Sequence, residues 1–273
     1  MDKENSARPA TGSDVYYALL YGSQAHYEQL ATICALKATL CTIPMSVSDA
    51  GVARVKLEWW RLEAERLTTG EPRHFLTRAY YDKYGADVVL GNALNALVCG
   101  LDSELGGRHF ATRDEQIVWF DASFGPLYGL QTSILARTNR DMAEDWQALG
   151  RWIEIGYSLL NLKLLATYKL KRIPTEALVA AGCTWDDIDS ARPSAVVANL
   201  VATECNLTID SIADILVTTA KETRRIHQAL FALAAIIQHT LIELKEDGCQ
   251  IWQHRIELTA LRKLWLAWRM RYL

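Results

Sequence analysis

Apolar residues recur every three or four positions along almost the whole chain, and this spacing constrains the fold more than any other feature. It is typical of helices that bury one face. No stretch combines alternating apolar and polar residues with the turns of a β-hairpin. Glycine and proline are few, at 15 and 6 of 273 residues, so long helices with short connections are expected. The segment over residues 30–40 shows the pattern at Leu30, Ile33, Leu36 and Leu40.

Capping residues and prolines predict where these helices begin and end. Pro44 ends the helix over residues 30–40, because proline lacks a backbone donor and restrains the residue before it. Ser48 or Asp49 is expected to cap a helix that runs to about residue 68. Thr112 and Glu115 fit a capping box. Further helices are expected over residues 73–83, 86–101, 113–137, 141–170, 175–181, 185–190, 194–203, 209–247 and 256–271.

The chain is expected to form one domain after a short tail. Residues 1–13 are polar, lack the apolar core of a signal peptide and are predicted to be disordered. Residues 14–273 contain no linker rich in Gly, Ser or Pro and no internal repeat, which favours a single domain. The longest apolar run, over residues 229–237, is too short to span a bilayer. A cytoplasmic protein is therefore expected.

Charge and composition exclude several classes of function. The net charge is −3, which argues against a nucleic-acid partner. The six cysteines lie far apart and are predicted to be buried thiols in a reducing compartment. No pair of histidines has the spacing of a helical zinc site, and no glycine-rich phosphate loop is present.

One acidic cluster has two interpretations. Asp141 and Asp145 would lie one turn apart on a helix, with Glu144 between them, and could share a Mg²⁺ ion. The same acids stand where a helix is expected to begin, and the helix dipole favours carboxylates there. The second interpretation is preferred.

Several segments, in order along the chain, resemble the squalene/phytoene synthase family. Residues 52–61 (VARVKLEWWR) are similar to its K-L-x-W-W-R helix. Residues 70–79 (GEPRHFLTRA) are similar to its G-x-P-x-H-P-x-T-x-A turn, with Phe75 in place of the second proline. Residues 149–161, 172–178 and 248–265 are similar to later segments, so the resemblance covers residues 14–271.

The resemblance implies an all-α, isoprenoid-synthase-like helical bundle with a central cavity. Active members of the family join two prenyl diphosphates head to head. Aspartate-rich motifs on two facing helices hold Mg²⁺, which neutralises the charge of the departing diphosphate. The resemblance therefore implies acids at two places, on the helix around residues 32–40 and just after Asn161.

Both places lack acids. No Asp or Glu occurs between Glu28 and Asp49, or between Glu154 and Glu176. By the family register, Leu165 and Lys169 occupy the two aspartate positions of the second motif. A lysine about 4 Å from a dication is repelled by roughly 8 kcal/mol at an effective dielectric constant near 20. The family reaction is therefore not expected.

The preferred interpretation is a pseudoenzyme that binds an isoprenoid or another lipid, or that acts as an assembly-type protein for a protein partner. No catalytic residue, metal or cofactor is expected. The lysines have two interpretations: Lys37 and the Lys163/Lys169 pair meet a diphosphate directly, or Lys169, Lys171 and Arg172 form a solvated helix C-terminus, where the helix dipole favours cations. The second interpretation is preferred. The alternative is an active head-to-head prenyltransferase with Mg²⁺ held by acids such as Asp102, Glu104 or Asp141. The expected substrate-binding residues are Lys37, Tyr157, Asn161, Lys163, Leu165 and Lys169.

The C-terminal residues 256–273 predict an amphipathic helix. Its basic residues lie away from the apolar face, and two interpretations remain open. The apolar face packs on the bundle, or it lies in a membrane interface and makes a peripheral membrane contact. By their spacing the face comprises Leu258, Leu261, Trp265 and Trp268.

Overall fold

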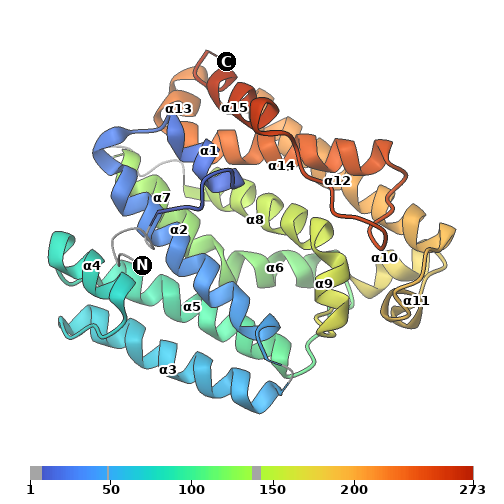
Figure 1. Ribbon diagram of the computed structural model, residues 1–273, viewed down its shortest axis with the longest axis horizontal. Helices are drawn as coiled ribbons and strands as arrows, with labels where there is room; N and C mark the ends of the chain where they lie inside the picture. Colours follow the sequence, from blue (N-terminus) through green and yellow to red (C-terminus); the bar gives the residue numbers. More distant parts are fainter. Residues whose placement is uncertain (1–7, 48, 137–142, 273) are drawn as a thin grey trace.

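The computed structural model describes residues 8–47, 49–136 and 143–272, and every regular element in these ranges is a helix. Figure 1 shows the helices packed as a bundle, with α8 running between α7 and α14. The all-α class is confirmed. The tail expected over residues 1–13 lies partly outside the described residues, and residues 8–13 precede the first helix.

The first half of the chain contains α1 (Asp14–Leu20), η2 (Gln24–His26), α2 (Tyr27–Thr42), η3 (Ile43–Met45), α3 (Ala50–Thr69), α4 (Phe75–Tyr84), α5 (Val88–Leu105), α6 (Arg113–Ser123) and α7 (Gly125–Ala136). The second half contains α8 (Ala143–Leu160), α9 (Leu162–Thr167), α10 (Thr175–Ala180), α11 (Trp185–Asp189), α12 (Ala195–Thr218), α13 (Lys221–Ile226), α14 (Gln228–Glu246) and α15 (Ala260–Arg269).

The centre of the bundle is built around α8 and α14. Helix α8 packs against α6, α7, α12 and α14, and α14 packs in addition against α1 and α15. Helices α2, α3, α4 and α5 form the other side, where α3 lies along α5 (Figure 1). A single large cluster of buried apolar side chains runs through both sides, which is the expected consequence of the three- and four-residue spacing.

The predicted caps are largely found. Of the two candidates for the start of α3, Asp49 is the cap, and its carboxylate accepts the N–H of Gly51 at 2.6 Å. Thr112 accepts the N–H of Glu115 at 3.3 Å, as a capping box requires. The Glu115 carboxylate, however, accepts the N–H of Ala111 at 2.7 Å rather than that of Thr112. The reciprocal half of the box is therefore displaced by one residue.

Several helices begin or end at other residues than the sequence predicts. The expected helices over 113–137, 141–170 and 209–247 are each divided, the second at Asn161 and the third between Thr218 and Gln228. The expected gap between 203 and 209 is absent, because α12 runs through it. Glu204 in that gap is buried against Arg113, with Nη2–Oε distances of 2.5 and 2.7 Å. Glu204, a polar residue that interrupts the apolar pattern of the sequence, is therefore the buried partner of Arg113.

Helix α5 is long and apolar, and one of its side chains is exposed where the sequence predicted burial. Within the described ranges it is the one helix long and apolar enough to cross a membrane, although half of it is buried in the bundle, and core helices of soluble proteins have the same property. Cys99, predicted to be buried, is exposed on this helix. Leu97, Val98 and Leu101 take the inward positions, which leaves Cys99 on the opposite side. Cys34 and Cys41 are partly exposed, and the other three cysteines are buried.

Helices α3 and α5 approach closely at Gly91. A Cβ atom there would collide with the Thr68 side chain and lie 2.9 Å from the carbonyl oxygen of Ala64. We expect Gly91→Ala to lower the free energy of unfolding by about 1–3 kcal/mol, because the backbone oxygen must move. Gly129→Ala, in α7, is the matched control, since nothing lies within 4 Å of its added Cβ.

Urea unfolding of both variants measures the difference. The control is expected to gain up to about 1 kcal/mol from the helix propensity of alanine. Equal changes in the free energy of unfolding for the two substitutions would show that the close approach of α3 and α5 does not require glycine at position 91.

Candidate functional site

A polar cluster in the centre of the bundle joins α2, α7 and α8. Lys37, one of the predicted site residues, donates hydrogen bonds to the Glu154 carboxylate and to the hydroxyl of Tyr128, the latter at 3.2 Å. The Tyr128 hydroxyl donates to Glu154 Oε1 at 2.6 Å. The Lys37 ammonium also lies 5.7 Å from the ring centre of Tyr157. The buried positive charge of Lys37 on α2 is thus neutralised by the carboxylate of Glu154 on α8.

The electrostatics of this cluster favour a closed ion pair. Burial alone would lower the pKa of Lys37, but the Glu154 carboxylate outweighs it, so the pKa lies above its ordinary value. Burial, with Glu154 adding to it, raises the pKa of Cys41 to about 12. Burial likewise raises the pKa of Cys34 to about 11. At neutral pH Lys37 therefore stays charged, and neither thiol is a nucleophile.

The acids required by the alternative interpretation are paired with arginines where the structure describes them. Glu104 is buried and forms a bidentate pair with Arg172, with distances of 2.6 and 2.9 Å. Asp102 lies 3.6 Å from Arg54 at the surface. Asp141 lies outside the described residues. Glu104 and Asp102 therefore stabilise the scaffold through arginine partners.

The residues at the two implied magnesium positions do not fit the ion. Mg²⁺ requires oxygen ligands in near-octahedral geometry. The charged side chain on the inner face of α2 is Lys37, and at the second position Leu165 is buried in the core while Lys169 is exposed at the end of α9. In the part of the chain that the structure describes, no three His, Cys, Asp or Glu side chains converge to hold a metal.

A pocket of about 480 Å³, which we call the α9 pocket, lies between the α8–α9 break and the segment over residues 251–256. This volume is typical of small-molecule sites. No carboxylate is among its lining residues, although His254 and Arg255 pair outside it with Asp247 and Glu257, each at 3.1 Å. The lining comprises Leu160, Asn161, Lys163, Leu164, Thr167, Leu244, Ile251, Gln253, His254, Arg255 and Ile256.

Two of the predicted site residues are held at this pocket by backbone carbonyls. Asn161 donates from Nδ2 to the carbonyl of Tyr157 at 2.8 Å, where α8 ends. Lys163 donates from Nζ to the carbonyl of Trp252 at 2.8 Å, which ties α9 to the C-terminal segment. Such a lysine retains two further donors for a bound anion.

The six predicted site residues thus occupy separate places. Lys37 and Tyr157 meet in the central cluster, and Asn161 and Lys163 meet in the α9 pocket. Lys169 lies beyond the C-cap Tyr168 of α9, where it is exposed and has a φ of 56°. His254 and Arg255 were not singled out from the sequence. The signal for Arg255 in the sequence was the excess of basic over acidic residues that begins there.

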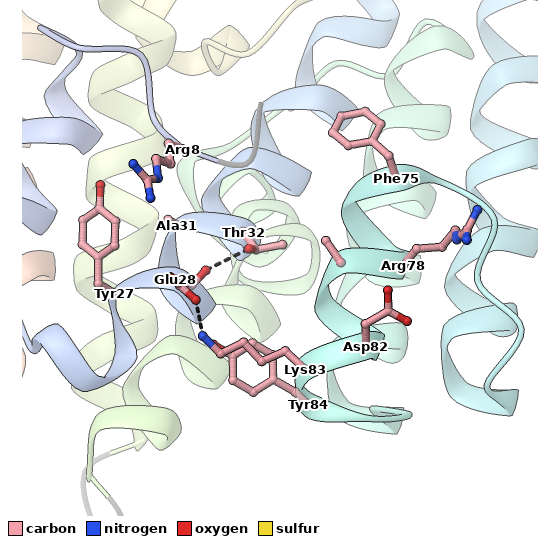
Figure 2. Close-up of a pocket in the computed structure, with 11 residues that line it drawn as sticks. Arg8, Tyr27, Glu28, Ala31, Thr32, Phe75, Arg78, Asp82, Lys83 and Tyr84 are labelled. Carbon is pink, nitrogen blue, oxygen red and sulfur yellow. Dashed lines mark hydrogen bonds and ion pairs between the residues drawn. The ribbon is translucent and has the colours of Figure 1, made fainter. Parts of the chain in front are cut away.

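A second pocket, of about 420 Å³, lies between α2 and α4 beside Arg8 (Figure 2). Lys83 pairs there with Glu28, whose backbone carbonyl accepts the hydroxyl of Thr32 at 2.8 Å. Phe75, which replaces the family's proline, also lines this pocket. Three cations and two acids line it, which leaves one net positive charge among its lining residues.

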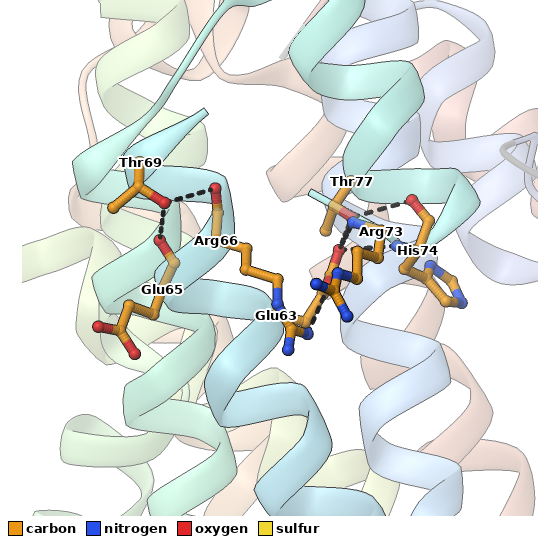
Figure 3. Close-up of polar contacts among 7 residues, drawn as sticks. All are labelled: Glu63, Glu65, Arg66, Thr69, Arg73, His74 and Thr77. Atoms are coloured by element: carbon orange, nitrogen blue, oxygen red, sulfur yellow. Dashed lines mark hydrogen bonds and ion pairs between the residues drawn. The ribbon is translucent and has the colours of Figure 1, made fainter. Parts of the chain in front are cut away.

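The first two segments that resemble the family, over residues 52–61 and 70–79, meet beside a buried carboxylate, Glu63 (Figure 3). It accepts the backbone N–H groups of Arg73 and His74, each at 2.7 Å, and the hydroxyl of Thr77. Arg66 lies 3.4 Å from its second oxygen. A carboxylate at the N-terminus of α4 is favoured by the helix dipole. These motifs therefore position α4 against α3, which is a structural role.

Comparisons with known proteins agree on the scaffold. A family model described as squalene/phytoene synthase matches residues 8–262. The fold is similar to that of a dehydrosqualene synthase crystallised with a ligand, with a TM-score of 0.77, 12% identity and coverage of 96% of this chain and 91% of that one. It is also similar to squalene synthase HpnC from Alicyclobacillus acidocaldarius, with a TM-score of 0.70, 14% identity and coverage of 90% and 93%. No curated protein sequence matches the chain.

Proposed function

We propose, from the premise that this chain belongs to the squalene/phytoene synthase family, that it binds an isoprenoid or another anionic lipid and does not catalyse metal-dependent prenyl transfer. The observation that carries the proposal is the Lys37–Glu154 pair. A cation stands on the helix where the family places a magnesium-binding acid, and the nearby carboxylate is already engaged by it. Mg²⁺ binding there would require breaking a buried ion pair, which costs several kcal/mol.

The α9 pocket supports the binding half of the proposal. Its cations are Lys163, Arg255 and, when protonated, His254, and ammonium and guanidinium groups bind phosphate without a metal. Its apolar side chains offer a surface for a hydrocarbon chain, whose burial is favourable by about 25 cal/mol per Å². A ligand with a phosphate at one end and a prenyl chain at the other matches this arrangement.

Farnesyl diphosphate titrated calorimetrically into EDTA-treated protein tests the binding. We expect the dissociation constant to be the same with and without Mg²⁺. Lys163→Ala is expected to weaken binding about 10- to 150-fold, since a charge-assisted hydrogen bond contributes about 1.5–3 kcal/mol. Lys169→Ala is the matched control, because Lys169 lies on the same segment but outside the pocket lining. Binding that requires Mg²⁺, or that is indifferent to Lys163→Ala, would contradict the proposal.

Incubation with farnesyl or geranylgeranyl diphosphate, Mg²⁺ and NADPH tests the absence of catalysis. We expect no presqualene diphosphate, squalene or phytoene above a control without protein. Detection of any of these products would overturn the non-catalytic half of the proposal and would leave the titration to decide the binding half.

A further inference from the structure

Helix α15 turns three large apolar side chains away from the bundle. The exposed fraction is 78% for Leu261, 48% for Trp265 and 44% for Trp268. These residues are one helical turn apart, so they form one continuous stripe. Tyr272 extends it, with 59% exposure and a ring centre 5.0 Å from that of Trp268. We call these four residues the α15 stripe.

The opposite face of α15 is held on the bundle by specific contacts. Lys263 is buried and pairs with Asp14 of α1 at 2.7 Å. Gln228, at the start of α14, donates to the carbonyl of Ala267 at 3.2 Å. Leu266 and Ala267 are buried on this same face. Rotating the stripe inward would break the buried ion pair, so its outward direction is a property of the fold.

This arrangement contradicts one of the two interpretations of the C-terminal helix, and the membrane contact stays a prediction. Of the apolar face predicted from spacing, only Leu258 is buried, and it precedes the helix. The remainder is the α15 stripe. The expectation that this face packs on the bundle is therefore wrong for the helix itself, because Lys263 and its neighbours occupy that side.

Basic residues accompany the stripe. Residues 258–272 contain four Lys or Arg and no Asp or Glu. The Arg269 guanidinium lies 5.1 Å from the ring centre of Trp265. Arg262 pairs with Glu243, whereas no acid pairs with Arg269 or Arg271 among the residues that the structure describes. The positive charge of these two arginines, beside the exposed α15 stripe, complements an anionic surface.

We propose that the α15 stripe is a docking surface for an anionic lipid bilayer, with α15 lying in the plane of the interface. Tryptophan and tyrosine rings are favoured at the level of the headgroups, and arginines beside them pair with lipid phosphates. A second copy of this chain fits less well, because a two-fold contact through the stripe would bring the same arginines of both copies together. The proposal does not depend on a ligand in the α9 pocket.

Co-sedimentation of the full chain with vesicles tests this proposal. We expect binding to vesicles made of equal parts phosphatidylserine and phosphatidylcholine, and little binding to phosphatidylcholine alone. Raising the salt from about 0.05 M to about 0.5 M should release the protein, because it shortens the range of the charge attraction. Trp265→Ala combined with Trp268→Ala should weaken partitioning about tenfold or more.

Trp59→Ala is the matched control, since Trp59 is a partly exposed tryptophan on α3. It should leave partitioning unchanged, and the urea midpoint of the double variant should equal that of the parent protein. Absence of binding to anionic vesicles at low salt would overturn the proposal. Loss of binding in Trp59→Ala instead of the double variant would also overturn it. So would a concentration-dependent dimer, seen by light scattering, that the double variant dissociates without any vesicle binding.

Discussion

Replacing Glu154 with alanine is expected to lower the free energy of unfolding by about 3–5 kcal/mol, because the Lys37 ammonium would remain buried without its partner. The Tyr128 hydroxyl would lose its acceptor in the same step, since it donates to Glu154 at 2.6 Å. For a chain of this length the melting temperature should fall by roughly 6–20 °C. Urea and thermal unfolding of the purified variant measure both quantities.

The double variant Lys37→Met with Glu154→Leu separates the pair from its neighbours. It should recover most of the loss, because an apolar replacement of similar volume leaves no buried charge. Glu58→Ala, which removes an exposed ion pair with Arg61 on α3, should change stability by less than about 0.5 kcal/mol. A double variant as unstable as the single one would show that Lys37 or Glu154 has further obligatory contacts.

Glu63→Ala is expected to be comparably destabilising, by about 3–5 kcal/mol. The substitution leaves the N–H groups of Arg73 and His74 without an acceptor in the interior, and each unsatisfied donor costs about 1–3 kcal/mol. It also removes the acceptor of the Thr77 hydroxyl. The expected result is a protein with a lower urea midpoint, in which amide exchange accelerates first in α4.

Two further variants make this prediction specific. Glu63→Gln keeps an acceptor oxygen at the same place, so its loss should be smaller, at about 1–2 kcal/mol. Glu65→Ala alters an exposed glutamate on the same helix and should stay within about 0.5 kcal/mol of the parent protein. An equal effect of Glu63→Ala and Glu65→Ala would show that the contacts of Figure 3 do not stabilise the turn between α3 and α4.

The sequence predicted the helices and the family well because both depend on local patterns. Apolar spacing and capping side chains act within one or two turns, so Asp49 and Thr112 could be identified without knowing the fold. The same local pattern misjudged α12, since Glu204 is stabilised by Arg113, which is 91 residues away in the chain. It also missed Glu63, because the donors that surround it come from the following turn and helix.

What the sequence by itself determined is the all-α class, the family, and the lack of acids at the two motif positions. Only the tertiary structure decided what the lysines near those positions do instead. Lys37 meets Glu154 across 117 residues, and Lys163 meets the carbonyl of Trp252 across 89. The direction of α15 was decided in the same way, by the pair between Lys263 and Asp14. Helical periodicity predicts which residues share a face of a helix. Which face turns inward depends also on the partners of buried charges, and those partners lie in segments that are distant in the sequence and meet only on folding.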